Sequence, residues 1–354
     1  MTDEKSTFLG RRELLSALTA AATGGLFVAA QARGDKATEP TAALKIIDFH
    51  NHYVGPSFPL TTLAKAPPAL QSQWERINRN LADPRSLLSS IEEAGIAARV
   101  INTPTAFLED AAGNVPADMI PRINDAVAEL ASKSPGRLYG LATVDAYAGD
   151  AAARELTRAV KELGLRGVFV ESAKRDLLPD AREARPAFAT AAALGVPVFV
   201  HPVTDPAMHN RFKKLGPLGV RLARANINAA ALVALLEGGV FDELPNLRVV
   251  VTTLALGGVL LAGGFGDGAR LRSDAPALTR RHVYIDTMGL HPVLLRAAVD
   301  VLGADHVLVG TDWPIAVEKS VPERLAAAFA ACGLSAAEQE MITSGNTLRL
   351  LGAA

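Results

Sequence analysis

Two histidines separated by one residue, His50 and His52, are the first side chains in this sequence whose type and spacing could do chemistry. They end the stretch Ile-Ile-Asp-Phe-His-Asn-His, whose apolar start predicts a strand. Because side chains alternate along a strand, both imidazoles should lie on one face with Asp48. Ile47 and Phe49 should lie on the other face. The pair could bind one divalent metal ion if other segments bring further ligands, and a hydrogen-bonded strand pair is the alternative.

Three more ionisable side chains come at the ends of apolar runs: Glu171, His201 and Asp312. Imidazoles and carboxylates are the usual protein ligands of such an ion. Asp312 follows Gly310, which permits close approach of the backbone, and precedes Pro314, which ends the strand. An aspartate there could bind the metal and also shuttle a proton. The alternative for Asp312 is a cap for the following helix.

Alternating strand and helix patterns must position these side chains. Eight strands are predicted, over residues 46–52, 98–103, 138–144, 166–171, 196–201, 247–253, 282–288 and 306–312. Helices are predicted between them, over residues 84–95, 122–132, 150–163, 182–194 and 226–237, from residue 256, and over residues 292–302, with two more closing the chain.

Several of these strands are continuous apolar runs, which is typical of parallel strands buried on both faces. Eight alternating units predict an α/β fold of the (β/α)8 TIM-barrel type, whose active site lies at the carboxyl ends of the strands. An open doubly wound sheet is the alternative, but no Gly-x-Gly-x-x-Gly follows the first strand to hold a dinucleotide. The predicted barrel would therefore gather the strand-end histidines and carboxylates in one place.

The remaining histidines divide by position along the strands. His291 follows the seventh strand and remains a candidate acid or base, and His209, in a loop expected after the fifth strand, is a weaker one. His282 and His306 begin strands, so we expect structural roles for them at the opposite end of the barrel.

A long proline-rich connection is predicted from residue 53 to residue 83, as a functional loop or a disordered one. Its Lys65, Arg76 and Arg79 could meet a substrate carboxylate, although surface solubility is the favoured explanation for each of them.

Composition indicates a folded globular protein with a small-molecule ligand. The chain has 354 residues, of which 49% are hydrophobic and 21% charged, and its formal net charge is -1. Dispersed basic residues argue against nucleic acid or an anionic membrane surface as the main partner. The single cysteine, Cys332, cannot form an internal disulfide.

The first residues predict a separate segment. Gly-Arg-Arg-Glu-Leu-Leu precedes a short apolar run and then Ala-Gln-Ala, which predicts a twin-arginine export signal over residues 1–32, cleaved after Ala32. A linker over residues 33–44 and a catalytic domain over residues 45–354 would follow. We expect a periplasmic protein with no stable membrane association after cleavage and no later transmembrane segment. A homodimer is compatible with the sequence.

Several motifs in order resemble the amidohydrolase superfamily, in the branch that includes aminocarboxymuconate-semialdehyde decarboxylase. The resemblance covers nearly all of the chain after residue 45, and its motifs include Ile-Asp-Phe-His-Asn-His, Pro-Val-Phe-Val-His-Pro, Gly-Gly-Val-Phe-Asp-Glu-Leu-Pro-Asn-Leu-Arg-Val, Gly-Thr-Asp-Trp-Pro and Gly-Asn-Thr-Leu-Arg-Leu-Leu. The resemblance implies that His50, His52, His201 and Asp312 bind one divalent metal ion, usually zinc and in some members manganese.

One departure from the family pattern falls on the sixth strand. Members of the branch place a catalytic histidine there, before two glycines, whereas this chain has Thr253. A threonine hydroxyl can orient water or a substrate oxygen but does not titrate near neutral pH. Proton transfer would then fall to His291 or Asp312.

Three functions are compatible with this sequence. The first expectation is a metal-dependent hydrolase that acts on a small carboxylated cyclic or aromatic-derived compound through metal-activated water. The second is a non-oxidative, metal-dependent decarboxylase, which the resemblance implies. The third is a binding protein that keeps the metal site without catalysis, since fold alone does not fix function.

Overall fold

A computed structural model describes residues 44–58, 60, 68–109, 115–264, 274–317 and 319–354. The predicted export signal, the linker up to residue 43 and Lys65 lie outside the described residues. All the helices and strands below belong to the compact unit Ala43–Ala354.

The described strands are all paired in parallel, in two sheets ordered β1-β2-β3 and β4 to β9. Their bounds are β1 Ile47–His52, β2 Ala98–Asn102, β3 Leu138–Gly140, β4 Ala142–Thr143, β5 Val168–Glu171, β6 Val198–His201, β7 Val249–Val251, β8 Val283–Asp286 and β9 Val307–Leu308. Only Leu141 separates β3 from β4, so each predicted strand is found. The prediction of an α/β fold with parallel strands is confirmed.

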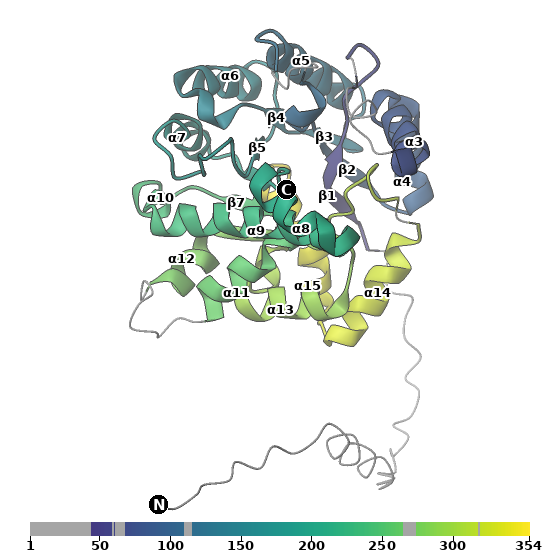
Figure 1. Ribbon diagram of the computed structural model, residues 1–354. Coiled ribbons are helices and arrows are strands. Elements are labelled where there is room, and N and C mark those ends of the chain that lie inside the picture. The colour runs from purple at the N-terminus through teal and green to yellow at the C-terminus, as the bar shows by residue number, and fades with distance from the viewer. Residues whose placement is uncertain (1–43, 59, 61–67, 110–114, 265–273, 318) are drawn as a thin grey trace, which may run out of the picture. The chain divides into compact units, whose positions relative to one another are not determined.

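Helices follow the strands along the chain and surround them in Figure 1. The α-helices are α3 Gln71–Ala82, α4 Pro84–Ala94, α5 Met119–Ser132, α6 Asp150–Lys161, α7 Arg185–Leu194, α8 Pro206–Phe212, α9 Gly216–Glu237, α10 Val240–Glu243, α11 Leu256–Gly264, α12 Ala275–His282, α13 Pro292–Leu302, α14 Val321–Cys332, α15 Ala336–Glu340 and α16 Asn346–Leu350. Short 3-10 helices are η1 Pro68–Leu70, η2 Thr105–Phe107, η3 Ala146–Ala148, η4 Lys213–Leu215, η5 Thr253–Ala255 and η6 Ala304–His306, and η7 Met341–Gly345 is a π-helix.

Helix α4 shows how local sequence sets the boundaries. Asp83 accepts hydrogen bonds from the backbone of Arg85 and Ser86, and Pro84 occupies the first turn, where its missing N–H costs nothing. Gly95 ends the helix in the left-handed conformation, at φ 69°. The helix predicted from these signals is confirmed.

Two expectations about connections were wrong. The connection from residue 53 to residue 83 contains α3, whose start has no side-chain cap and whose buried face is only Ile77 and Leu81, so its sequence signal is weak. His209 lies in α8 rather than in a loop. The signal for α8 was present, because Asp205 caps it by accepting from the Met208 N–H.

Alternate strand residues divide between two apolar clusters, which explains the continuous apolar runs. On β5, Phe169 joins one cluster, which also contains Leu350 and Leu351 of the C-terminal segment. Its neighbours Val168 and Val170 join the other cluster, beneath the helices. Both faces of the strands are therefore buried.

The chain after β9 returns to β1 and brings the ends of the domain together. The Phe49 N–H donates to the Val309 carbonyl oxygen at 2.8 Å, and the Asp312 N–H donates to the His50 carbonyl oxygen at 2.9 Å. The His52 N–H donates to the Trp313 carbonyl oxygen at 2.8 Å. The first and last predicted ligand segments therefore lie side by side.

One stretch, Pro206–Glu237, is long and apolar enough to cross a membrane by length and composition, a candidate that the sequence interpretation did not include. It consists of α8, η4 and α9. Asn228 of α9 is fully buried and donates to the Val200 carbonyl oxygen of β6 at 3.1 Å. This hydrogen bond ties α9 to β6, and 44% of the apolar window is buried.

Candidate metal centre

Four side chains converge where the strands end: His50 and His52 of β1, His201 of β6, and Asp312 after β9. Their potential ligand atoms all lie within 4.8 Å of one another. His52 Nε2 is 3.1 Å from Asp312 Oδ1, and His50 Nε2 is 3.4 Å from the same oxygen. The three histidines are buried. The structure therefore brings together the four residues predicted as metal ligands.

A β-bulge in β1 aims the first histidine, and strict alternation was a wrong expectation. The register between β1 and β2 shifts between Asp48 and Asn51. As a result Phe49 and His50 both lie against the Phe199 ring, with centroids 5.4 and 5.0 Å away. Bulges of this kind re-aim side chains next to functional sites.

Asp48 forms a buried ion pair with Arg99 of β2 and accepts from the His50 backbone N–H at 3.2 Å, so its carboxylate does not join the metal ligands. It also accepts hydrogen bonds from Thr311, from the hydroxyl at 2.6 Å and from the N–H at 3.0 Å. Burial raises the pKa of Asp48, although the Arg99 charge opposes the shift. This network fixes the backbone of the residue that precedes Asp312. It was not predicted from the sequence.

The close approach predicted at Gly310 is present. A Cβ atom at this position would lie 2.8 Å from the Asp286 Cβ and 2.9 Å from the His50 Cβ. Real Cβ atoms do not approach so closely, so only glycine lets the last strand pass here.

Two neighbours orient the histidines of β1. His50 Nδ1 is 2.6 Å from Asp286 Oδ2, and His52 Nδ1 is 2.9 Å from Asn102 Oδ1. Carboxylate and amide oxygens accept hydrogen bonds, so each Nδ1 carries the proton and each Nε2 keeps its lone pair. Asp286 and Asn102 were not predicted from the sequence, although both stand near the ends of predicted strands, where polar residues are informative.

The protonation states fit a metal site. Burial lowers the pKa of His52, and burial together with the two neighbouring histidines lowers that of His201 well below its usual value. Burial opposes ionisation of Asp312, but the charges of His50 and His52 outweigh it and lower the pKa. Burial also opposes protonation of His50, but Asp286 and Asp312 raise its pKa. Neutral imidazoles and an ionised carboxylate are what a metal ion requires, and metal binding would favour the neutral form of His50.

Three atoms of the group are buried and have no hydrogen-bond partner among the described residues: His50 Nε2, His201 Nδ1 and Asp312 Oδ1. Buried polar atoms are rarely left unpaired, because each costs about 1–3 kcal/mol. A divalent ion would satisfy lone pairs that converge in this way. The donor set of three imidazoles and one carboxylate therefore fits one divalent metal ion.

Glu171 ends β5 but does not belong to the group of four. Its Oε1 accepts hydrogen bonds from Thr105, from the N–H at 3.0 Å and from the hydroxyl at 2.9 Å. Burial raises the pKa of Glu171 to about 7, although the bonds from Thr105 oppose the shift. It pairs with His201 in the β5–β6 register. A carboxyl group that can hold a proton near neutral pH thus lies beside the histidines.

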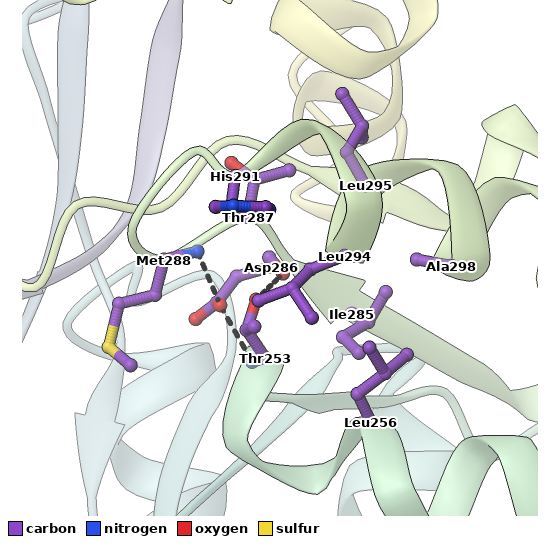
Figure 2. Close-up of a pocket in the computed structure, with 10 residues that line it drawn as sticks. All are labelled: Thr253, Leu256, Ile285, Asp286, Thr287, Met288, His291, Leu294, Leu295 and Ala298. Atoms are coloured by element: carbon purple, nitrogen blue, oxygen red, sulfur yellow. Dashed lines mark hydrogen bonds between the residues drawn. The ribbon is translucent and has the colours of Figure 1, made fainter. Parts of the chain in front are cut away.

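Thr253, which stands near the position of the histidine expected on the sixth strand, serves Asp286. The Thr253 N–H donates to Asp286 Oδ1 at 2.9 Å, the Met288 N–H donates to the same oxygen at 3.0 Å, and the Thr253 hydroxyl donates to the Asp286 carbonyl oxygen. Figure 2 shows these bonds in a narrow pocket of about 10 Å³, room for about one water. The threonine hydroxyl is therefore occupied by the backbone.

The other candidate residues lie outside the group of four. His291 is exposed and caps α13 by accepting from the Val293 N–H at 3.3 Å, although it also lines the pocket of Figure 2. Arg76 and Arg79 lie on α3, and within the described part of the chain neither is seen bonded to a residue of the site. His209 is partly buried on α8.

Comparisons with known proteins agree with this geometry. A family model described as amidohydrolase matches residues 47–353. The 2-amino-3-carboxymuconate-6-semialdehyde decarboxylase of Dictyostelium discoideum is 25% identical over 288 residues, which are 79% of each chain. The gamma-resorcylate decarboxylase of Rhodococcus jostii is 29% identical over 231 residues, 56% of this chain and 66% of that protein.

A solved structure shares the fold. It is a dihydroxybenzoic acid decarboxylase from Polaromonas sp. with bound manganese and the inhibitor 2-nitroresorcinol. Its TM-score is 0.70 at 24% identity, over 87% of this chain and 97% of that one. The predicted resemblance to the branch of aminocarboxymuconate-semialdehyde decarboxylase is confirmed by these relatives.

Proposed function

The chain belongs to the amidohydrolase family, and on that premise we propose that it is a metal-dependent, non-oxidative decarboxylase of a small aromatic carboxylate. The observation that carries the proposal is the convergence of His50, His52, His201 and Asp312 at the strand ends. Two relatives, which match 79% and 56% of this chain, are named decarboxylases. Both support a carboxylated substrate.

This proposal changes the order of the expectations from the sequence. Hydrolysis was the first expectation from the sequence, because the reaction needs only metal-activated water and one proton shuttle. The relatives favour the second expectation instead, since they are named decarboxylases of carboxymuconate semialdehyde and of resorcylate. Decarboxylation is therefore the better supported reaction.

His50, His52, His201 and Asp312 would hold the metal ion. A divalent ion bound there would act as a Lewis acid that polarises substrate oxygen atoms. Manganese is present in a structurally similar decarboxylase, whereas zinc was expected from the sequence resemblance. Elemental analysis of protein purified without chelators decides between the two ions.

The protein side chains would orient the ligands and supply the proton. Asp286 and Asn102 hold the tautomers of His50 and His52. Decarboxylation breaks the bond from the ring carbon to the carboxylate, releases carbon dioxide and adds one proton to that carbon. Glu171 can hold this proton near neutral pH, and Asp312, whose pKa is lowered, can shuttle it. Two carboxyl groups with pKa values displaced in opposite directions form an acid–base pair.

Carbon dioxide release tests the reaction. Metal-loaded protein is incubated with hydroxybenzoates, gamma-resorcylate included, and with esters and lactones, while oxygen uptake is recorded. We expect carbon dioxide release without oxygen uptake from at least one hydroxybenzoate, and loss of at least 100-fold in Asp312→Asn. Turnover of only the esters or lactones would establish hydrolysis. Binding of carboxylates with no turnover would establish the non-catalytic alternative.

Three further proposals concern the barrel, the export route and the oligomeric state. We propose that both sheets belong to one (β/α)8 barrel, supported by the hydrogen bonds between β1 and the segment after β9. Export by the twin-arginine route to the periplasm is proposed from residues 1–32, and fractionation of cells that produce Arg11→Lys or wild-type protein tests it. A homodimer is proposed from the sequence alone, and sedimentation measurements test that.

A further inference from the structure

Arg224 lies on the face of α9 that packs against the strands. Asn228, four residues later, donates to the Val200 carbonyl oxygen at 3.1 Å and accepts from the Thr252 hydroxyl at 2.8 Å. Residues four apart share one face of a helix and differ by about 6 Å along its axis. Helix α9 returns from the carboxyl end of β6, so Arg224 lies one turn nearer that end than Asn228, at the level of His201 or above it.

The charge of Arg224 reaches three residues around the metal centre. Burial has the largest influence on the pKa of Glu171, His201 and Asp312, and the Arg224 charge lowers the pKa of each. These residues come from β5, from β6 and from the segment after β9, so they border the site from different directions. These directions agree with the placement that the helix geometry of α9 gives, beside the carboxyl end of β6.

Arg224 is partly buried, and in the part of the chain that the structure describes no hydrogen bond or ion pair joins it to another residue. Arg221, one turn earlier on α9, is exposed to solvent. A guanidinium has five N–H donors in a planar fork that matches a carboxylate. A partly buried one without an acceptor is available for a ligand.

We propose that Arg224 binds a carboxylate of the substrate as a bidentate ion pair and thereby selects anionic ligands for this site. The assignment of an aromatic carboxylate as the ligand rests on the proposed function. Arg224 is then the binding residue that the three arginine and lysine candidates from the sequence did not include.

Calorimetric titration with matched ligands tests the assignment. Each hydroxybenzoate is compared with its uncharged carboxamide, on wild-type protein, Arg224→Met and Arg224→Lys, both manganese-loaded and metal-free. Arg224→Met should weaken carboxylate binding roughly 10- to 100-fold, the range for a charged hydrogen-bonded pair, and change carboxamide binding less than about twofold. Arg224→Lys should fall between, because lysine loses the bidentate geometry. The metal content of all variants should stay at the wild-type value.

Arg221→Met is the matched control, since it makes the same change on the same helix at an exposed position. It should bind carboxylates as the wild-type protein does. Equal losses for carboxylate and carboxamide in Arg224→Met, no loss at all, or a wild-type protein without preference for carboxylates would each overturn the assignment. Carboxylate binding that depends on Arg224 without carbon dioxide release would instead overturn the proposed reaction and leave this assignment intact.

Discussion

Histidines stand at both ends of the parallel strands, and their partners differ. At the amino ends, His282 and His306 each place Nδ1 2.7 Å from a backbone carbonyl oxygen. Each ring also stacks on one aromatic ring, His282 on Phe241 at 4.6 Å and His306 on Tyr284 at 4.3 Å. These two side chains fill space and close hydrogen bonds, as expected from their positions in the sequence.

At the carboxyl ends, three histidine rings face one another instead. The centroids of His50, His52 and His201 lie 4.9 to 5.2 Å apart, edge to face. Their contacts leave His50 Nε2 and His201 Nδ1 buried without partners.

An unpaired nitrogen alone does not identify a ligand, because His282 Nε2 is also buried without a partner. The difference lies in convergence. Several unpaired atoms and one carboxylate point at the same small volume at the carboxyl ends, whereas His282 Nε2 is not part of such a group among the described residues. Metal affinity needs the shared volume, since an ion is held by several ligands at once.

Removing a histidine from either end should separate the two roles most strongly. His201→Ala deletes one of the four proposed metal ligands. Loss of a residue that only hydrogen-bonds to a ligand lowers metal affinity roughly 10- to 100-fold, so the loss in His201→Ala should be larger. Activity should fall with it. His282→Ala should keep the wild-type metal content. Elemental analysis after gel filtration measures both, and equal metal in the two variants would invalidate the distinction between the ends.

Each end of the strands also has an aspartate near a histidine, and the two aspartates differ in burial and distance. Asp286 is buried 2.6 Å from His50 Nδ1, whereas Asp305 is exposed and 3.9 Å from His306 Nε2. Asp286→Asn should weaken metal binding roughly 10- to 100-fold, because it removes the charge that makes His50 a stronger ligand. Asp305→Asn should have no effect on metal binding. Competition with a fluorescent chelator measures the dissociation constants, and an unchanged constant in Asp286→Asn would contradict the orienting role.

The fold was predictable where the signals are local. The cap, proline and glycine of α4, and the limits of α13 at Pro292 and Leu302, depend on residues inside or next to each helix. Helix α3 lacks such a cap and buries little, so tertiary packing decides it. The β-bulge before His50 could not be predicted either, because it depends on the register against β2.

The site was predictable to the same extent. The strand-end histidines and Asp312 could be predicted as metal ligands, because their residue type and their position at a strand end both indicate that role. Asp286 and Asn102 matter through contacts with residues 236 and 50 positions away, which no local pattern records. Arg224 is one of 36 basic residues, and nothing in its sequence neighbourhood separates it from Arg221. Only the direction in which each side chain points makes that distinction.

The free energy of unfolding should depend more on His282, at the amino ends of the strands, than on His201, at the carboxyl ends. His282→Ala removes a buried ring stacked on Phe241 and its hydrogen bond, which should lower the free energy of unfolding by about 2–3 kcal/mol. His201→Ala in metal-free protein should lower it less, because an unpaired buried imidazole is itself unfavourable. Urea unfolding of both variants in a chelator measures this. A larger loss in His201→Ala would show that the metal-site histidines also stabilise the fold.

The smallest effect concerns Glu171, at the site end. Its pKa in the folded protein is raised by burial to about 7 from 4.5, so between these values the folded state binds more protons than the unfolded state. Its contribution to stability is therefore full below pH 4.5 and is lost as the pH rises toward 7. Glutamine does not titrate, so metal-free Glu171→Gln should gain stability relative to wild type between pH 5 and 7.5, by about 2 kcal/mol. Urea midpoints at both pH values measure the difference. The same difference at both would mean that Glu171 ionises freely in the folded protein and cannot hold the proton that decarboxylation requires.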